Sequence, residues 1–93
     1  MNFINGKFYE IYLNLGIPEN GYIIEYSEVE SEMILNIREE VAQYIQDPSE
    51  ILTVEATFDT EPVSGEMVFE ADVSFQTPYG IQAKHISGIV ELS

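Results

Sequence analysis

Carboxylates are the side chains of this chain that could most readily do chemistry, and most of them lie in one stretch. Of 93 residues, 17 are Asp or Glu and three are Lys or Arg, so the formal charge is −14. Residues 25–72 hold 14 of these acids and one base, Arg38, and carry −13 by themselves. Clustered carboxylates can bind cations, act as acid/base pairs or contact basic proteins. Each role makes a different demand on spacing and burial.

Neither metal nor catalytic chemistry fits the spacing. The acids of 59–72 lack the oxygen ligand at every second residue through a glycine turn that a Ca²⁺ loop needs. A glycosidase-type pair needs a walled cleft, for which a 93-residue domain has little room. We interpret His85, the single histidine, as a surface residue of a strand and Ser64 as part of a turn. The sequence predicts a protein that is not an enzyme and that binds no metal or cofactor.

Length and composition predict a single soluble domain, residues 1–93. The chain has no cysteine, which excludes disulfides and thiolate chemistry. No signal peptide and no apolar run long enough to span a membrane are visible. An acidic chain is repelled by nucleic acid and anionic membranes and attracted by basic proteins. We therefore expect a basic protein partner, with no direct nucleic-acid or membrane binding.

The C-terminal half predicts an antiparallel meander of three strands. Apolar residues alternate with polar ones over 52–58 and again over 67–75, with EPVSGE between them as a hairpin loop. TPYG then predicts a turn into a last strand over 81–92. Its apolar residues change phase near Lys84 and His85, which predicts a β-bulge there.

Residues 27–46 predict one helix. Ser27 and Glu30 have the spacing of a capping box, and the residue before Pro48 ends the helix. The expected buried stripe has helical spacing; it consists of Val29, Met33, Ile37, Val41 and Tyr44 or Ile45.

The first 26 residues are compatible with two structures. Residues 7–15 fit a helix or a strand, and their aromatic and β-branched content favours a strand. That strand would pair with residues 22–26 through a loop containing Asn20 and Gly21. The predicted fold is α+β: an antiparallel sheet of about five strands, in the order β-β-α-β-β-β, with one main helix packed on it.

The candidate binding residues are acids that the predicted elements expose in two rows. Outward positions of the hairpin strands form the first row: Glu55, Asp59, Glu66, Glu70 and Asp72. The helix supplies the second: Glu28, Glu32, Glu39 and Glu40. Same-face neighbours on a strand are about 6.6–6.8 Å apart, and one helical turn rises about 5.4 Å. If both rows lie on one surface, they can imitate the charge density of a DNA backbone, which carries one phosphate per ~3.4 Å of axis on each strand.

An acidic face can also simply be solvated, which protects edge strands and keeps a domain soluble. The missing counter-charge favours a binding role, because ordinary surfaces mix both signs. At the level of a class, the size, charge and acidic faces of this chain resemble the small acidic inhibitors of bacteriophages, including DNA mimics of the anti-restriction and anti-CRISPR type. The resemblance implies a protein in the cytoplasm of a bacterial host cell that occupies the basic groove of a nucleic-acid-binding protein.

Two other functions remain open from the sequence. An immunity protein or antitoxin that neutralises a basic nuclease toxin would have the same acidic features. A structural module, such as a homo-dimer with a solvated acidic surface, would have them without a basic partner.

Overall fold

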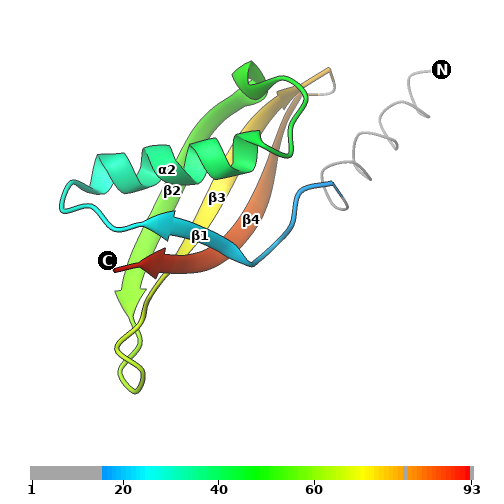
Figure 1. Cartoon of the computed structure of the whole chain (residues 1–93). Coiled ribbons are helices and arrows are strands. Elements are labelled where there is room, and N and C mark those ends of the chain that lie inside the picture. Colours follow the sequence, from blue (N-terminus) through cyan, green and yellow to red (C-terminus); the bar gives the residue numbers. More distant parts are fainter. Residues whose placement is uncertain (1–15, 79, 93) are drawn as a thin grey trace.

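The described part of the chain forms a four-stranded sheet that carries one α-helix on one of its faces (Figure 1). This computed structural model describes residues 16–78 and 80–92. The elements are β1 (Tyr22–Glu25), α2 (Glu30–Ala42), a short 3₁₀ helix η1 (Pro48–Glu50), β2 (Ile51–Thr60), β3 (Met67–Thr77) and β4 (Gly80–Glu91). The strand order is β1-β4-β3-β2. The α+β class is confirmed, and the described residues form four strands in a mixed sheet, whereas a wholly antiparallel sheet of about five strands was predicted.

The predicted meander is confirmed in β2, β3 and β4, which pair antiparallel in sequence order. Alternation along β3 buries Phe69, Ala71, Val73 and Phe75 and leaves Glu70 and other residues between them exposed. The loop from β2 to β3 is closed by the Glu61 amide donating to the carbonyl of Glu66, at 2.8 Å. Gly65, at φ +71°, takes the left-handed conformation that this turn requires.

The prediction that all strands pair antiparallel is wrong at residues 22–26. Residues 22–25 do form a strand, β1, but it pairs in parallel with β4, with Tyr22 beside Gly88 and Ile24 beside Val90. A Cβ at Gly88 would lie 2.2 Å from the carbonyl oxygen of Tyr22, so glycine permits β1 to approach at this point. The other half of the predicted hairpin, residues 7–15, lies outside the described residues.

The predicted bulge near Lys84 and His85 is also wrong. The β3–β4 register runs without interruption from Met67↔Val90 to Thr77↔Gly80, and the irregularity lies in β2, between Ile51 and Thr53. The apparent change of phase arises because Lys84 occupies a buried position that alternation would give to an apolar residue. Its aliphatic stem is buried while its ammonium group lies 3.6 Å from the Glu19 carboxylate.

Helix α2 is shorter than the predicted 27–46. Val29 is its N-cap residue, and the predicted capping box does not form. Ser27 instead accepts from the amide of Val29 (3.1 Å) and donates to the Glu32 carboxylate (2.7 Å), which orders the turn before the helix. After Ala42 the chain continues in a tighter turn, because the amides of residues 43–45 donate three residues back.

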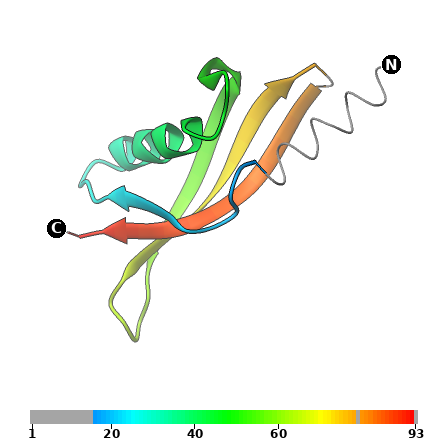
Figure 2. The same ribbon diagram turned by 45° about the vertical axis from the view of Figure 1, so that its right-hand side comes forward.

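The core lies between α2 and one face of the sheet (Figure 2). The helix packs against β1 and β2, the two edge strands, and so crosses the sheet between its edges. From the predicted stripe, Met33, Ile37 and Val41 are buried and Ile45 packs half-buried against the core, whereas Val29 and Tyr44 are exposed. The opposite face of the sheet carries no helix within 16–78 and 80–92, and we call it the outer face. None of the described helices is long and apolar enough to cross a membrane.

Candidate functional site

Four of the five predicted hairpin acids lie together on the outer face. Strand alternation places Glu55 and Asp59 of β2 and Glu70 and Asp72 of β3 opposite the core residues, and all four are exposed. We call these four residues the acidic sheet face. The fifth, Glu66, lies in the loop before β3 and not on the strand.

The β2–β3 register sets the spacing of these carboxylates. Glu55 stands directly opposite Asp72, which for an antiparallel pair means Cβ atoms about 4.5–5.5 Å apart. Asp59 pairs with Val68, so that Glu70 is its diagonal neighbour, about 7–8 Å away. Like charges placed directly across a strand pair repel, so this arrangement costs stability in the isolated protein.

His85 joins the acidic sheet face from β4. It stands opposite Asp72; its Nδ1 lies 2.8 Å from Asp72 Oδ1, and its Nε2 lies 3.4 Å from Glu70 Oε1. These hydrogen bonds, first the one to Asp72 and then the one to Glu70, raise the pKa of His85 above its ordinary value of 6.5. The protonated imidazole donates to both carboxylates and partly offsets their repulsion.

This role of His85 was not predicted from the sequence, although the length of the β3–β4 turn indicates it. Only Pro78 and Tyr79 separate the paired residues Thr77 and Gly80, and a two-residue connection fixes the register of a hairpin. Counting back from that turn places His85 opposite Asp72.

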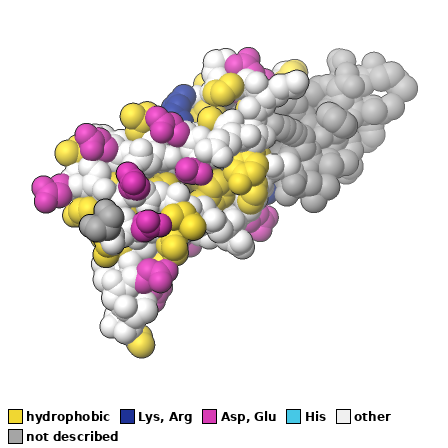
Figure 3. All heavy atoms as spheres, viewed as in Figure 1, with side chains coloured by type: hydrophobic (Ala, Val, Ile, Leu, Met, Phe, Trp, Pro, Cys, Tyr) yellow, Lys and Arg dark blue, Asp and Glu magenta, His cyan; other side chains and the backbone are white. Residues whose placement is uncertain are grey.

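The helix acids do not join the hairpin acids. Glu28 precedes α2, Glu32 lies in its first turn, and Glu39 and Glu40 follow later in the helix. Since α2 covers the inner face of the sheet, this row and the acidic sheet face lie on opposite sides of the molecule. Figure 3 shows the helix side, where acidic side chains are spread over the helix and the strand edge beside it. The two predicted rows therefore form two separate acidic surfaces.

Both described Lys and Arg side chains are used inside the fold. The Arg38 guanidinium, on α2, donates to the backbone carbonyl of Ile51, where β2 begins. Lys84 is buried and its ammonium group lies beside the Glu19 carboxylate. Consequently neither of them lies on the outer face to balance its carboxylates.

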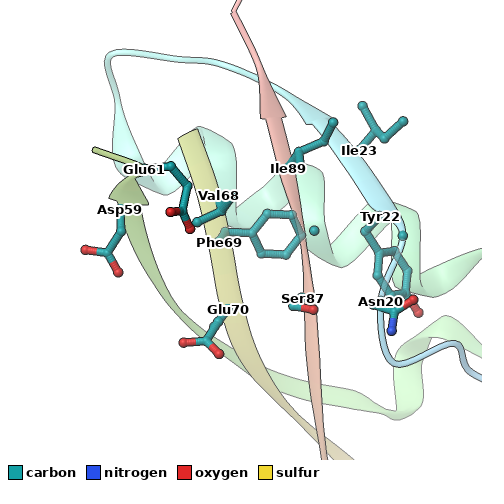
Figure 4. Close-up of a pocket in the computed structure, with 12 residues that line it drawn as sticks. Asn20, Tyr22, Ile23, Asp59, Glu61, Val68, Phe69, Glu70, Ser87 and Ile89 are labelled. Atoms are coloured by element: carbon teal, nitrogen blue, oxygen red, sulfur yellow. The ribbon is translucent and has the colours of Figure 1, made fainter. Parts of the chain in front are cut away.

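A groove of about 630 Å³ adjoins the acidic sheet face, where β1, β4 and β3 meet (Figure 4). Ile23, Val68 and Ile89 line its apolar part, and Asp59, Glu61 and Glu70 line its acidic side. Two of these acids, Asp59 and Glu70, belong to the predicted site, whereas the apolar residues were not predicted. Outward-facing Val and Ile are common in strands, so alternation alone does not distinguish these residues from others.

Within the described ranges, no group of three or more His, Asp or Glu side chains is placed to hold a metal ion. No protein-family model, curated protein or solved structure matches the chain. The candidate site is therefore defined by its geometry alone: an exposed acidic sheet face, one histidine held within it and an adjoining groove.

Proposed function

We propose that this protein is a non-enzymatic inhibitor that places its acidic sheet face in the basic groove of a nucleic-acid-binding protein and so excludes nucleic acid. The observation that carries the proposal is the arrangement of charge on the outer face. Four carboxylates are grouped on the outer face, while both described Lys and Arg side chains have partners elsewhere in the fold, the Ile51 carbonyl and the Glu19 carboxylate.

The spacing of the carboxylates supports contact with side chains that bind phosphates. Glu70 and Asp72 are two residues apart on β3, about 6.6–6.8 Å along the strand. That is about twice the ~3.4 Å axial spacing of phosphates on one DNA strand, and β2 contributes a second row beside it. Arginine and lysine side chains that bind phosphates bind carboxylates by the same charge-assisted hydrogen bonds.

The repulsion within the acidic sheet face also supports a binding role. Glu55 and Asp72 stand opposite each other on the adjacent strands β2 and β3, and the nearby His85 is neutral at high pH. A basic partner would relieve this repulsion on binding, so part of the destabilisation of the free protein would appear as affinity. The helix acids, on the other side, add to the long-range attraction that speeds encounter with a basic protein.

The first test is capture of a partner from a nuclease-treated bacterial lysate on the tagged protein, at low and at high salt. We expect mass spectrometry to identify a nucleic-acid-binding protein whose capture is lost at high salt and is competed by duplex DNA. The captured protein would then be purified and titrated with this one. A nuclease toxin as the partner would instead identify an immunity protein, and self-association alone would indicate a structural module.

Two triple variants with the same change of net charge show which acidic surface contacts the partner. The sheet variant is E55K/D59K/E70K and the helix variant is E28K/E32K/E39K. If the acidic sheet face is the contact, the sheet variant loses at least about tenfold more affinity than the helix variant, because close charge pairs across an interface contribute more than distant ones. Equal losses would show that only total charge matters and would contradict the proposed surface.

A further inference from the structure

Resting on the proposed function, we infer that the groove beside the acidic sheet face takes an apolar side chain from an arginine- or lysine-rich segment of the partner polypeptide. The segment would lie across β3 and β4, with its apolar residue in the groove and its basic residues on the neighbouring carboxylates.

The apolar residues of the groove form one row across three strands. In the sheet register Ile23 of β1 pairs with Ile89 of β4, and Ile89 pairs with Val68 of β3. All three face outward; Ile23 is 51% exposed, and Val68 and Ile89 are half-buried. The row therefore presents a contiguous apolar strip to solvent, which is the usual surface for an apolar anchor.

This strip is confined to one end of the outer face. The next row along the sheet consists of Ser87, Glu70 and Thr57, and the row after it of His85, Asp72 and Glu55. Because these rows are polar, the groove offers a single apolar position beside a polar surface, and so fits one apolar residue within a polar segment.

The carboxylates at the edge of the apolar strip indicate which residues flank the apolar residue in the bound partner segment. Asp59 ends the apolar row on β2, opposite Val68, while Glu61 follows the end of that strand and Glu70 lies in the next row. Figure 4 shows these three carboxylates along one side of the groove and Ile23 and Ile89 on the other. An anionic or neutral ligand would leave them without counter-charge, whereas flanking guanidinium or ammonium groups would bind them.

The size of the groove agrees with a short peptide segment. Its volume of about 630 Å³ lies within the range of roughly 300–1,000 Å³ typical of ligand sites. A second copy of this chain is a poor occupant, because the copies would bring two acidic faces together.

The test uses two amidated, acetylated peptides, Arg-Arg-Leu-Arg-Arg and Arg-Arg-Ser-Arg-Arg, titrated into the full-length ¹⁵N-labelled protein. Both carry the same charge, so their difference reports the apolar position. We expect the leucine peptide to bind about tenfold more tightly, as follows from burying one leucine side chain. The amide signals of Ile23, Val68 and Ile89 should shift with the leucine peptide more than with the serine peptide.

Two variants test whether the leucine side chain of the peptide binds in the groove. Val68→Thr keeps the shape of a groove residue and replaces one of its methyl groups by a hydroxyl, so it should reduce the tenfold preference to less than about threefold. Ile81→Thr removes a larger apolar group, an ethyl, at an outward position of β4 that is 65% exposed and outside the groove, so the preference should remain. Ile23→Thr, on the edge strand, is a second groove variant should Val68→Thr fail to fold.

The outcomes separate this inference from the proposed function. Equal binding of the two peptides would overturn the groove as an anchor site, while a DNA-competed partner would still support the acidic sheet face. A preference for leucine that Val68→Thr removes would support the groove even if no such partner were captured. If both groove variants still bind the leucine peptide more tightly than the serine peptide, the leucine side chain binds outside the groove. That result would overturn the inference.

Discussion

His85 is held between the carboxylates of Asp72 and Glu70, and its protonation therefore changes both the stability and the charge of the acidic sheet face. Its pKa in the folded protein is raised above 6.5, chiefly by the hydrogen bond to Asp72. A raised pKa means that the folded state binds the proton more tightly than the unfolded state. The stabilisation is therefore fully present below pH 6.5 and is lost as the pH rises through the folded-state value.

We expect His85→Gln to lower the free energy of unfolding at pH 5.5 and to have little effect at pH 9, measured by urea denaturation. The proton-linked stabilisation exists only at the lower pH, where wild-type His85 is charged. NMR titration of the wild-type imidazole should give a midpoint above 6.5, and Asp72→Asn should lower that midpoint. A wild-type midpoint at or below 6.5 would contradict the paired geometry.

Residue-level prediction from the sequence was limited by register. Alternation correctly exposed Glu55, Asp59, Glu70 and Asp72, because period two alone decides which face a strand residue takes. The neighbours of each residue on adjacent strands depend on how those strands are aligned, and periodicity carries no information about this alignment. His85 was for that reason interpreted as an isolated surface residue.

At the scale of elements, α2 is stabilised by a narrow buried stripe. Ile37 is fully buried against the sheet, whereas Leu35, on the same helix, is 53% exposed. We expect Ile37→Ala to reduce the free energy of unfolding by about 2–5 kcal/mol, through lost burial and the cavity left behind. Leu35→Ala should change it by no more than about 0.5 kcal/mol. Similar losses in urea denaturation of the two variants would contradict the packing of the helix.

The β1–β4 pair depends on glycine at position 88. A Cβ there would lie 2.2 Å from the Tyr22 carbonyl oxygen and 2.7 Å from the Phe69 ring. We expect Gly88→Ala to destabilise the protein by about 1–3 kcal/mol, because β1 or the ring must move. Ser87→Ala, at the neighbouring outward position, should change stability by no more than about 0.5 kcal/mol and serves as the control. Thermal unfolding of both variants measures the difference.

The elements with local contacts were predicted well, and those with distant contacts were not. The β2–β3–β4 meander was predicted because its turns and alternation lie within neighbouring residues. The partner of β1 lies at the other end of the described chain, and no local pattern identifies it. The false bulge had a different cause, since Lys84 is buried by virtue of its stem and its contact with Glu19.

For the whole molecule, a net charge of −14 on 93 residues implies self-repulsion in the folded state. We expect the urea midpoint to rise when NaCl is increased from about 10 mM to about 150 mM, because the Debye length falls from about 30 Å to about 8 Å. The variant E55Q/D59N/E70Q/D72N should show a smaller rise. An equal rise in the variant would indicate that the acidic sheet face does not contribute to the repulsion.

The sequence also predicted how much charge the molecule carries better than where the charge lies. Imitation of DNA by both acidic rows required that they lie on one surface, but α2 lies across the inner face of the sheet, so the rows lie on opposite sides of the molecule. Which face a helix covers is decided by the packing of the complete sheet, which no single segment encodes.

The parallel contact between β1 and β4 has a consequence for the order of folding. The pair joins Tyr22 to Gly88, so it closes a loop of 66 residues, whereas β2, β3 and β4 are linked by short connections. Closing a long loop carries an entropic cost that is recovered only after the contact forms. We therefore expect the meander to form in the transition state and β1 to dock afterwards. In stopped-flow kinetics, Ile24→Val should accelerate unfolding and leave the folding rate nearly unchanged.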